Sequence, residues 1–364
     1  EPSIEEDPNG IRRFNTEKAK RYDALVRGKK IAITYLANYN ENDIEEERVR
    51  FFSGLNDALL DSRGEESVDN DGVRPILLYV HGFNQTFNQA LLTAAHLAVD
   101  LSYAPDTRNL PAYDPETVYG VGVPVVFSWV NKGIFTGYYA DKYYSYEAID
   151  QFSQLFDELV DQSNANEINV VVHSMGNRLF TKAIDKLVAT YADATNKHLK
   201  IRVIHAAADV YPPDFEREAS KLPLGWSNLH TIYTSNVDDA LDWAQNFNRK
   251  GFGWGSPGCR VGYVTEDCPP LVLDDPRFST VATNGFYLRY KEKRRFLFWK
   301  WEVERDDMGH GSFENGEAII ADMSCVLRNS TSRHQIGDRA IYQPVPEQPN
   351  SFVLDPAYGK PPCT

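Results

Sequence analysis

A serine followed two residues later by a glycine could supply the nucleophile of a hydrolase. Ser174 comes directly after an apolar run at 168–172, which predicts a short buried strand, and Gly176 opens a helix-like segment. This order of strand, serine, glycine and helix is the layout of a nucleophile elbow, whose sharp turn raises the serine hydroxyl above the carboxyl edge of a sheet. The elbow pattern also has a glycine two residues before the serine, where this chain has Val172. The match is therefore partial.

A serine hydroxyl becomes a good nucleophile only with a base beside it and a carboxylate that holds the base. In an α/β-hydrolase these groups follow the chain order Ser, Asp, His. Of the five histidines after Ser174, one precedes a predicted strand and two lie inside strands, which leaves His310 and His334. We favour His310, because a Gly-His-Gly turn after the last strong strand would expose its ring. His334 lies further on in a polar loop.

Three aspartates follow predicted strands and could hold the base. Asp238 and Asp239 follow the second strand after the elbow strand, where the acid of this fold usually lies. Neighbouring side chains point in different directions, so only one of the two can face the histidine. Asp209 is the alternative acid, although it could equally be a turn or helix-capping residue before two prolines.

An oxyanion hole requires backbone N–H groups beside the serine. The segment His81-Gly82-Phe83-Asn84 directly follows a predicted strand at 74–80, one strand–helix–strand unit before the elbow strand. A glycine there allows the backbone to approach a ligand closely. We therefore expect the N–H groups of Phe83 and Met175 to form the hole, with His81 as a secondary candidate for the site.

Strands and helices alternate along the chain, which predicts a mostly parallel central sheet with helices on both faces. Predicted strands lie at 30–36, 74–80, 123–129, 168–172, 201–207, 229–234, 286–290 and 295–303, and predicted helices at 44–60, 87–101, 138–160, 215–222 and 240–247. We divide the chain into an N-terminal arm (1–28), an α/β-hydrolase domain (29–343) and an irregular C-terminal tail (344–364). Within the domain, residues 250–285 are predicted to form a long loop or lid.

Composition excludes several classes of function. The 364-residue chain has a formal net charge of −14, which argues against nucleic acid and against electrostatic attraction to anionic lipid. No run approaches the roughly 20 apolar residues of a membrane span. The sequence has neither a phosphate-binding loop nor cysteines spaced with histidines as zinc ligands, so we expect no cofactor and no metal.

Four cysteines occur late in the chain: Cys259, Cys268, Cys325 and Cys363. Pairing of the first two would close a Gly/Pro-rich loop, and pairing of the last two would attach the tail. Four free thiols are the alternative. Disulfides would fit an oxidising compartment, as would removal of a segment before Glu1. Location outside the cytoplasm, by secretion or in a periplasm, is thus the expectation, with a cytoplasmic location as its alternative.

Several motifs together resemble those of a bacterial α/β-hydrolase family of unknown function. The resemblance covers roughly residues 30–325 and rests on the segments 80–84, 127–129, 173–178, 207–209, 233–241 and 260–262 and on His310. It implies an α/β-hydrolase fold and a triad of Ser174, Asp238 and His310, with the Phe83 and Met175 amides as the oxyanion hole. Val172 and the length of the 250–285 segment depart from the family pattern.

These residues predict a serine esterase or lipase-like hydrolase that cleaves a small-molecule or lipid-like carboxylic ester through an acyl-enzyme. Two alternatives stay open. The same fold could serve as a non-catalytic binding module, because fold does not determine function. The same triad could also transfer the acyl group to an alcohol or an amine.

Overall fold

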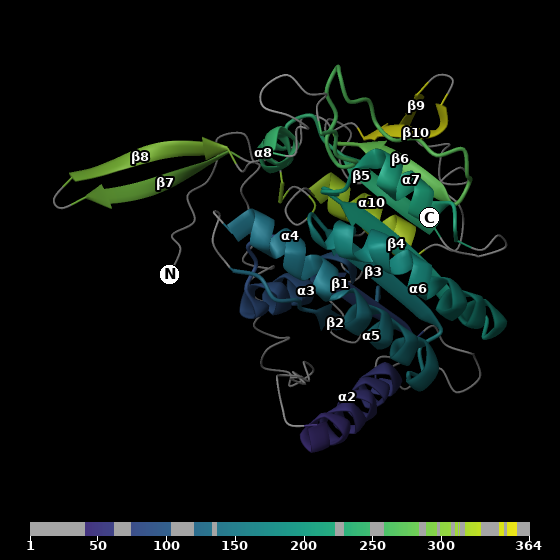
Figure 1. Ribbon diagram of the computed structural model, residues 1–364. Coiled ribbons are helices and arrows are strands. Elements are labelled where there is room, and N and C mark those ends of the chain that lie inside the picture. The colour runs from purple at the N-terminus through teal and green to yellow at the C-terminus, as the bar shows by residue number, and fades with distance from the viewer. Residues whose placement is uncertain are drawn as a thin grey trace, which may run out of the picture.

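Seven parallel strands and one antiparallel edge strand form the central sheet of this computed structural model (Figure 1). The structure describes residues 41–61, 74–102, 120–132, 137–222, 229–247, 258–283, 289–296, 299–306, 310–311, 313, 317–328, 342–345 and 348–354. The sheet has the order β2-β1-β3-β4-β5-β6-β10-β9. Its strands are β1 (Pro75–Val80), β2 (Val123–Phe127), β3 (Glu167–His173), β4 (Lys200–Ala206), β5 (Leu229–Thr234), β6 (Phe278–Ala282), β9 (Tyr342–Val345) and β10 (Gln348–Leu354). The predicted α/β fold with a mostly parallel sheet is confirmed.

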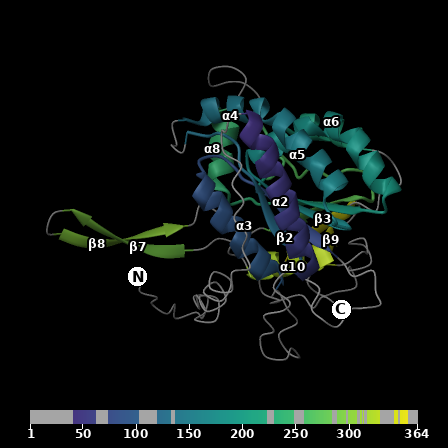
Figure 2. The ribbon, with the colours of Figure 1, turned by 90° about the horizontal axis from the view of Figure 1, so that it is seen from below.

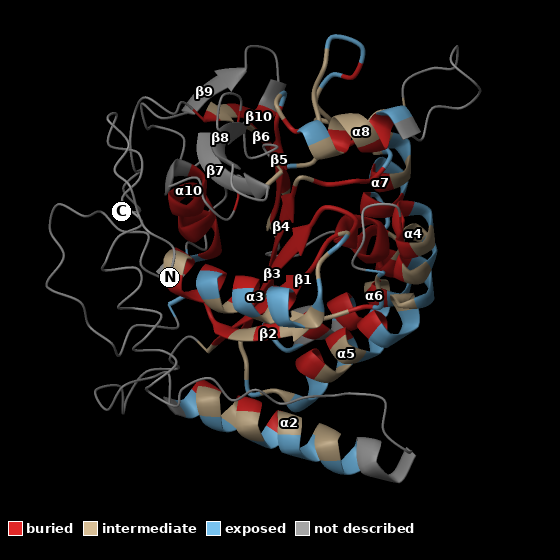
Figure 3. Cartoon of the chain, turned by 90° about the vertical axis from the view of Figure 1, so that its left-hand side faces the viewer, coloured by how far each residue is buried: buried red, intermediate tan, exposed pale blue. Residues whose placement is uncertain are grey.

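Helices cover both faces of this sheet, and Figure 3 shows the buried strands between them. Successive residues of β1 point to opposite faces: Leu78 and Val80 belong to one apolar cluster, and Leu77 and Tyr79 to another. Burial on both faces explains why the strands read as continuous apolar runs. The first cluster includes residues of α2 (Glu41–Asp61), α4 (Tyr138–Glu147), α5 (Ile149–Gln162), α6 (Gly176–Asn196), α7 (Pro212–Ala219) and α8 (Asp239–Phe247), and the second includes residues of α3 (Phe87–Ser102) and α10 (Glu317–Arg328).

The helices differ from prediction in two places. The single helix expected at 138–160 is two helices that meet at Ala148, and each buries its own set of side chains, Tyr138 in α4 and Phe152 in α5 among them. Helix α10, which was not predicted from the sequence, packs Ile319 and Met323 into the second cluster.

The predicted irregular tail at 344–364 is wrong for its first part, because β10 extends the sheet. Strand β10 pairs in parallel with β6 and buries Phe352 and Leu354. Prolines suggested irregular structure, but Pro344 lies in the edge strand β9, where a missing N–H can be tolerated. A sequence window could not reveal this pairing, since β6 lies about 70 residues earlier in the chain.

The long loop or lid predicted at 250–285 also differs from the structure where residues are described. Residues 260–264 form backbone hydrogen bonds to the segments that follow β4 and β5: Val261 N donates to Val210 O and Gly262 N to Ala208 O, while Ser235 N donates to Gly262 O. The segment then ends in β6. The described part of this segment is therefore built into the carboxyl edge of the sheet.

A disulfide joins Cys259 and Cys268, with their Cα atoms 5.6 Å apart, as one of the two predicted pairings proposed. Cys325 is buried and also disulfide-bonded. Cys363, His334, the arm at 1–28 and the predicted strand at 30–36 lie outside the described residues. Within the described ranges, no helix is long and apolar enough to cross a membrane.

Strands β7 (Arg289–Phe296) and β8 (Trp299–Asp306) form a separate antiparallel hairpin. Figures 1 and 2, which differ by a quarter turn, both show this hairpin extending away from the helices and the central sheet. The two strands occupy the chain between β6 and His310, where the sequence predicted strands at 286–290 and 295–303.

A chain of buried polar side chains crosses the middle of the sheet. The Nδ1 atom of His205 lies 2.8 Å from Asn177 Oδ1, and its Nε2 atom lies 3.0 Å from Nδ1 of His230. An amide oxygen only accepts, so His205 donates from Nδ1 and accepts from His230 at Nε2. Burial lowers the pKa of His230 to about 3, so both rings are neutral in the folded protein.

This neutrality predicts loss of stability in mild acid. The unfolded imidazole titrates near 6.5, so below that pH the unfolded chain binds a proton that folded His230 does not bind until about pH 3. We expect the free energy of unfolding to fall as the pH is lowered from about 6.5, by about 3 kcal/mol at pH 4.5 from His230 alone. In His230→Asn, whose amide can still donate to His205, urea unfolding across this range should show a shallower pH dependence. Exposed His198, which has a φ of 55° that asparagine tolerates, supplies the control His198→Asn. Parallel pH profiles for wild type and His230→Asn would contradict the assignment.

The position of β10 predicts that Phe352→Ala destabilises the protein by about 3–5 kcal/mol, because it leaves a cavity in the second cluster. The control is Leu92→Ala on α3, whose side chain is 59% exposed and whose loss should cost little. Urea unfolding monitored by circular dichroism measures both. Equal midpoints for the two variants would show that β10 is not part of the core.

Candidate active site

Ser174 lies in a strained turn at the carboxyl end of β3, as the elbow prediction requires. Its φ is 50°, in the left-handed region that residues with a side chain seldom adopt. The turn begins directly after His173, the last residue of β3, and α6 begins at Gly176. Backbone bonds hold it on both sides, since Ser174 N donates to Ala206 O at 3.0 Å and Ser174 O accepts from Asp209 N at 3.2 Å. Strain of this kind is typical of functional positions.

Two glycines allow the backbone after β1 to lie directly against this turn. A Cβ atom at Gly82 would be 2.7 Å from the Cβ of Ser174, and one at Gly176 would be 2.6 Å from the carbonyl oxygen of His81. Neither position can hold a larger residue without backbone movement. Val172, which departs from the elbow pattern, is fully buried in the first apolar cluster. The close packing at the elbow therefore comes from Gly82 and Gly176.

The side chain of Asn177 links the elbow to β3 and β4 by hydrogen bonds. Its Nδ2 atom donates to the carbonyl oxygens of Val172 at 2.9 Å and Ser174 at 3.2 Å, while its Oδ1 accepts from His205. The side chain is fully buried. Because loss of a buried amide would leave several polar groups without partners, this side chain strongly favours one conformation of the turn.

Asp238 and His310 meet at the carboxyl edge, although 72 residues separate them. The Nδ1 atom of His310 lies 2.8 Å from Oδ2 and 3.0 Å from Oδ1 of Asp238. Asp238 Oδ1 also accepts from the N–H of Leu241 at 2.8 Å, which caps α8. The carboxylate is 1% exposed and the imidazole 20% exposed. Asp239 is exposed, so of the two predicted neighbours only Asp238 holds the histidine.

His173 brings the ring of His310 next to the elbow, a role that the sequence analysis missed. Ring centroids lie 4.7 Å apart for His173 and His310, and 4.4 Å apart for His173 and Phe313. Burial, and then the nearby His310, hold the pKa of His173 well below its usual value. The residue beside Ser174 is therefore a neutral ring, and it places no charge next to His310.

His81 has a structural position in this site. Its Nε2 atom accepts the N–H of Trp129 at 3.1 Å, and its Nδ1 atom lies 2.8 Å from Gly82 O. The indole N–H of Trp129 donates to His81 O at 2.9 Å, and the two rings stack. Burial lowers the pKa of His81 to about 4. These bonds hold a neutral His81 in place and fix the backbone that leads to Phe83.

Phe83 and Met175, whose N–H groups are the predicted oxyanion hole, belong to the two backbone segments that Gly82 and Gly176 allow to approach each other. Phe83 follows Gly82, and its ring packs edge-on against Tyr138 with centroids 5.6 Å apart. Met175 follows Ser174 and is fully buried immediately before α6. The N-terminus of a helix carries partial positive charge, which favours an anion at this position.

Asp209, the alternative acid, forms ion pairs with two arginines. Arg178 donates to it from Nη2 at 2.9 Å and from Nε at 3.3 Å, and Arg260 Nε lies 2.7 Å from its Oδ1. The hydroxyl of Tyr138 also donates to Asp209 at 2.8 Å. Burial alone would raise the pKa of Asp209, but the two arginines outweigh it and lower the pKa to about 2. This cluster fixes the loop after β4 beside the elbow, and the sequence offered only the presence of Arg178 and Arg260 in the motifs.

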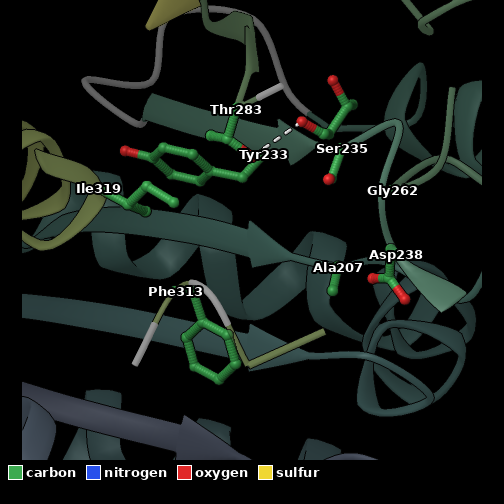
Figure 4. A pocket seen from close by; sticks show the side chains of 9 residues that line it. Ala207, Tyr233, Ser235, Asp238, Gly262, Thr283, Phe313 and Ile319 are labelled. Carbon is green, nitrogen blue, oxygen red and sulfur yellow. Dashed lines mark hydrogen bonds between the residues drawn. The ribbon is translucent and has the colours of Figure 1, made fainter. Parts of the chain in front are cut away.

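A small cavity of about 10 Å³ lies beside Asp238, with room for about one water molecule (Figure 4). Ala207, Gly262 and Phe313 are among the residues that line it. The part of the chain that the structure describes has no group of three or more His, Cys, Asp or Glu residues that could hold a metal ion.

A family model described as "Alpha/beta hydrolase of unknown function (DUF900)" matches residues 61–252. The matched segment includes Ser174 and Asp238 and ends before His310. A comparison with curated proteins gave no match. The family match covers more than half of the 364 residues, and the sheet order and the elbow agree with it. The chain belongs to this family of α/β-hydrolases.

Proposed function

We propose that the protein is a serine hydrolase that cleaves carboxylic esters, with Ser174 as nucleophile, His310 as base and Asp238 as the acid that orients it. The hydrogen bond between His310 and Asp238, made beside a serine in a strained elbow, carries this proposal. A buried carboxylate on Nδ1 leaves Nε2 as the nitrogen that can take a proton, as a serine nucleophile requires.

The proposed reaction has two halves. Ser174 Oγ attacks the ester carbonyl while His310 Nε2 takes its proton, and Asp238 stabilises the resulting imidazolium. The imidazolium then gives the proton to the leaving alcohol, and the acyl group stays on Ser174. In the second half His310 takes a proton from water, whose oxygen attacks the acyl carbon, and the imidazolium then returns the proton to Ser174 Oγ as the bond from Oγ to the acyl carbon breaks and the acid leaves.

The N–H groups of Phe83 and Met175 would hold the oxyanion in both halves. The positions of the two residues support this assignment. Phe83 follows Gly82, whose lack of a Cβ lets the backbone lie against Ser174, and Met175 directly precedes α6. The stacked His81 and Trp129 make this arrangement rigid before substrate binds. Donors that are already in place cost little reorganisation when charge develops.

A strained serine beside a carboxylate-bound histidine has a role in a hydrolase but none in a non-catalytic binding module. The hydrolase is therefore the better supported of the two alternatives. Acyl transfer would use the same three residues, and products formed with an added alcohol would reveal it. The Cys259–Cys268 bond supports the expectation of an oxidising compartment outside the cytoplasm.

Removal of the nucleophile gives the first test. We expect Ser174→Ala to lose ester hydrolysis by on the order of 10³-fold or more and to lose labelling by a fluorophosphonate, which reacts with activated serines. The control Ser220→Ala changes an exposed serine at the end of α7 and should keep both properties. Hydrolysis of short p-nitrophenyl esters measures the rate. An equally active Ser174→Ala enzyme would refute the mechanism.

The choice of acid gives the second test. Asp238→Asn keeps an N-cap for α8 but presents an amide to His310, so kcat should fall by about 10³–10⁴-fold through the wrong tautomer. Asp239→Asn removes the exposed neighbouring carboxylate, and its kcat should stay within a few fold of wild type. Equal losses in the two variants, with unchanged thermal stability, would rule out Asp238 as the specific partner of His310.

A further inference from the structure

Asp141 is a buried carboxylate that the proposed mechanism does not use. It lies in the first turn of α4, and none of its surface is exposed. Its Oδ1 atom accepts the backbone N–H of Lys132 at 2.7 Å. Burial raises the pKa of Asp141, whereas the backbone N–H groups of Lys132 and Asn84 and the charge of Lys132 oppose this rise. Asp141 therefore faces backbone donors from two loops, one that follows β1 and one that follows β2.

The loop that follows β1, residues 81–85, is held at both ends by other groups. At its start, His81 forms hydrogen bonds with Trp129 and stacks on its ring. At its end, the side chain of Gln85 donates to the hydroxyl of Thr93 in α3 at 3.0 Å. These contacts fix the two ends of the loop independently of α4.

The two residues in the middle of the loop, Phe83 and Asn84, are contacted from α4. The ring of Phe83 packs against Tyr138, and the N–H of Asn84 faces Asp141. Asn84 is exposed and has a φ of 57°, a left-handed conformation that persists when the surroundings support it. The peptide unit between Phe83 and Asn84 adjoins the one that carries the Phe83 N–H. The conformation of this turn therefore sets the direction of that N–H.

We propose that Asp141 is a positioning residue of the oxyanion hole: its carboxylate holds the turn at Asn84 so that the N–H of Phe83 meets the oxygen of the reacting carbonyl. This inference rests on the proposed hydrolase function. Donors of an oxyanion hole avoid reorganisation only when their backbone is already in place. An acid in the first turn also stabilises its own helix. Asp150 can have only this second role, in α5, where its side chain is 74% exposed, and it provides the matched control.

Ester hydrolysis by Asp141→Asn gives the first test. The amide has the shape of the carboxylate, but its nitrogen cannot accept, so one backbone N–H loses its acceptor. We expect kcat to fall about 10- to 100-fold with KM within about threefold, because a displaced donor costs less than a lost one, which costs about 10²–10³-fold. Asp150→Asn should keep the wild-type kcat. Equal kcat values for the two variants would overturn the proposal.

An inhibitor that forms the oxyanion distinguishes positioning from a general loss of structure. Ser174 Oγ adds to the carbonyl carbon of phenyl trifluoromethyl ketone, its proton passes to His310, and the carbonyl oxygen becomes the oxyanion. The Ki of this ketone should rise about tenfold or more in Asp141→Asn, whereas the Ki of acetophenone, which binds without addition, should change less than about threefold. Equal changes for both ketones would leave Asp141 a structural role alone and contradict the proposal.

Two further measurements do not depend on the folding of one buried variant or on activity. Glycine adopts a φ of 57° freely and valine does not, so Asn84→Val should lose at least about tenfold more kcat than Asn84→Gly. Hydrogen exchange at the Asn84 N–H, followed by NMR, should be at least about tenfold faster in Asp141→Asn than in Asp150→Asn. Equal exchange in these two variants would show that Asp141 does not hold the turn. A wild-type protein without esterase activity would instead refute the proposed function, and the exchange rates would still decide the role of Asp141.

Discussion

The backbone conformation of Ser174 is the constraint on which the rest of the site depends. A φ of 50° at a residue with a side chain costs about 1–3 kcal/mol, so neighbouring groups must stabilise it. Asn177 does so by donating to the carbonyls of Val172 in β3 and of Ser174, and Gly82 and Gly176 do so by permitting close backbone packing. The buried chain from Asn177 through His205 to His230 links this turn to β4 and β5. The elbow is thus fixed by the core of the sheet.

Parallel pairing explains how distant residues reach this elbow. Strands β1, β3, β4 and β5 are neighbours and run in one direction, so the segments that follow them meet at one edge. That edge receives Phe83 after β1, Ser174 after β3, Asp209 after β4 and Asp238 after β5. His310 follows β6 only after the hairpin, and the contact between the rings of His173 and His310 brings it back to the elbow.

Features that local sequence patterns encode could be predicted, whereas features that depend on contacts between distant segments could not. Buried strands and the elbow are local, because apolar runs and glycine positions reveal them. The place after β5 left both Asp238 and Asp239 as candidate acids, and the family resemblance favoured Asp238. Strand β10 depends on pairing with β6, and α10 on a face of the sheet that β1 and β4 help to form. The role of Asp209 could not be predicted either, because Arg178, Arg260 and Tyr138 come from three other segments.

The two buried aspartates at this edge are suited to different tasks because their partners differ. Asp209 faces two guanidinium groups and a tyrosine hydroxyl, which keep it ionised and satisfied, so a third cationic partner would add little. Among the described residues, the carboxylate of Asp238 accepts from a backbone N–H and faces the imidazole of His310, so a proton gained by that ring would lie beside a carboxylate that has no guanidinium partner in this part of the structure. Stabilisation of an imidazolium requires such a charge. Exchange of these roles would require moving two arginines across the sheet edge, which is why we propose Asp238, and not Asp209, as the acid of the reaction.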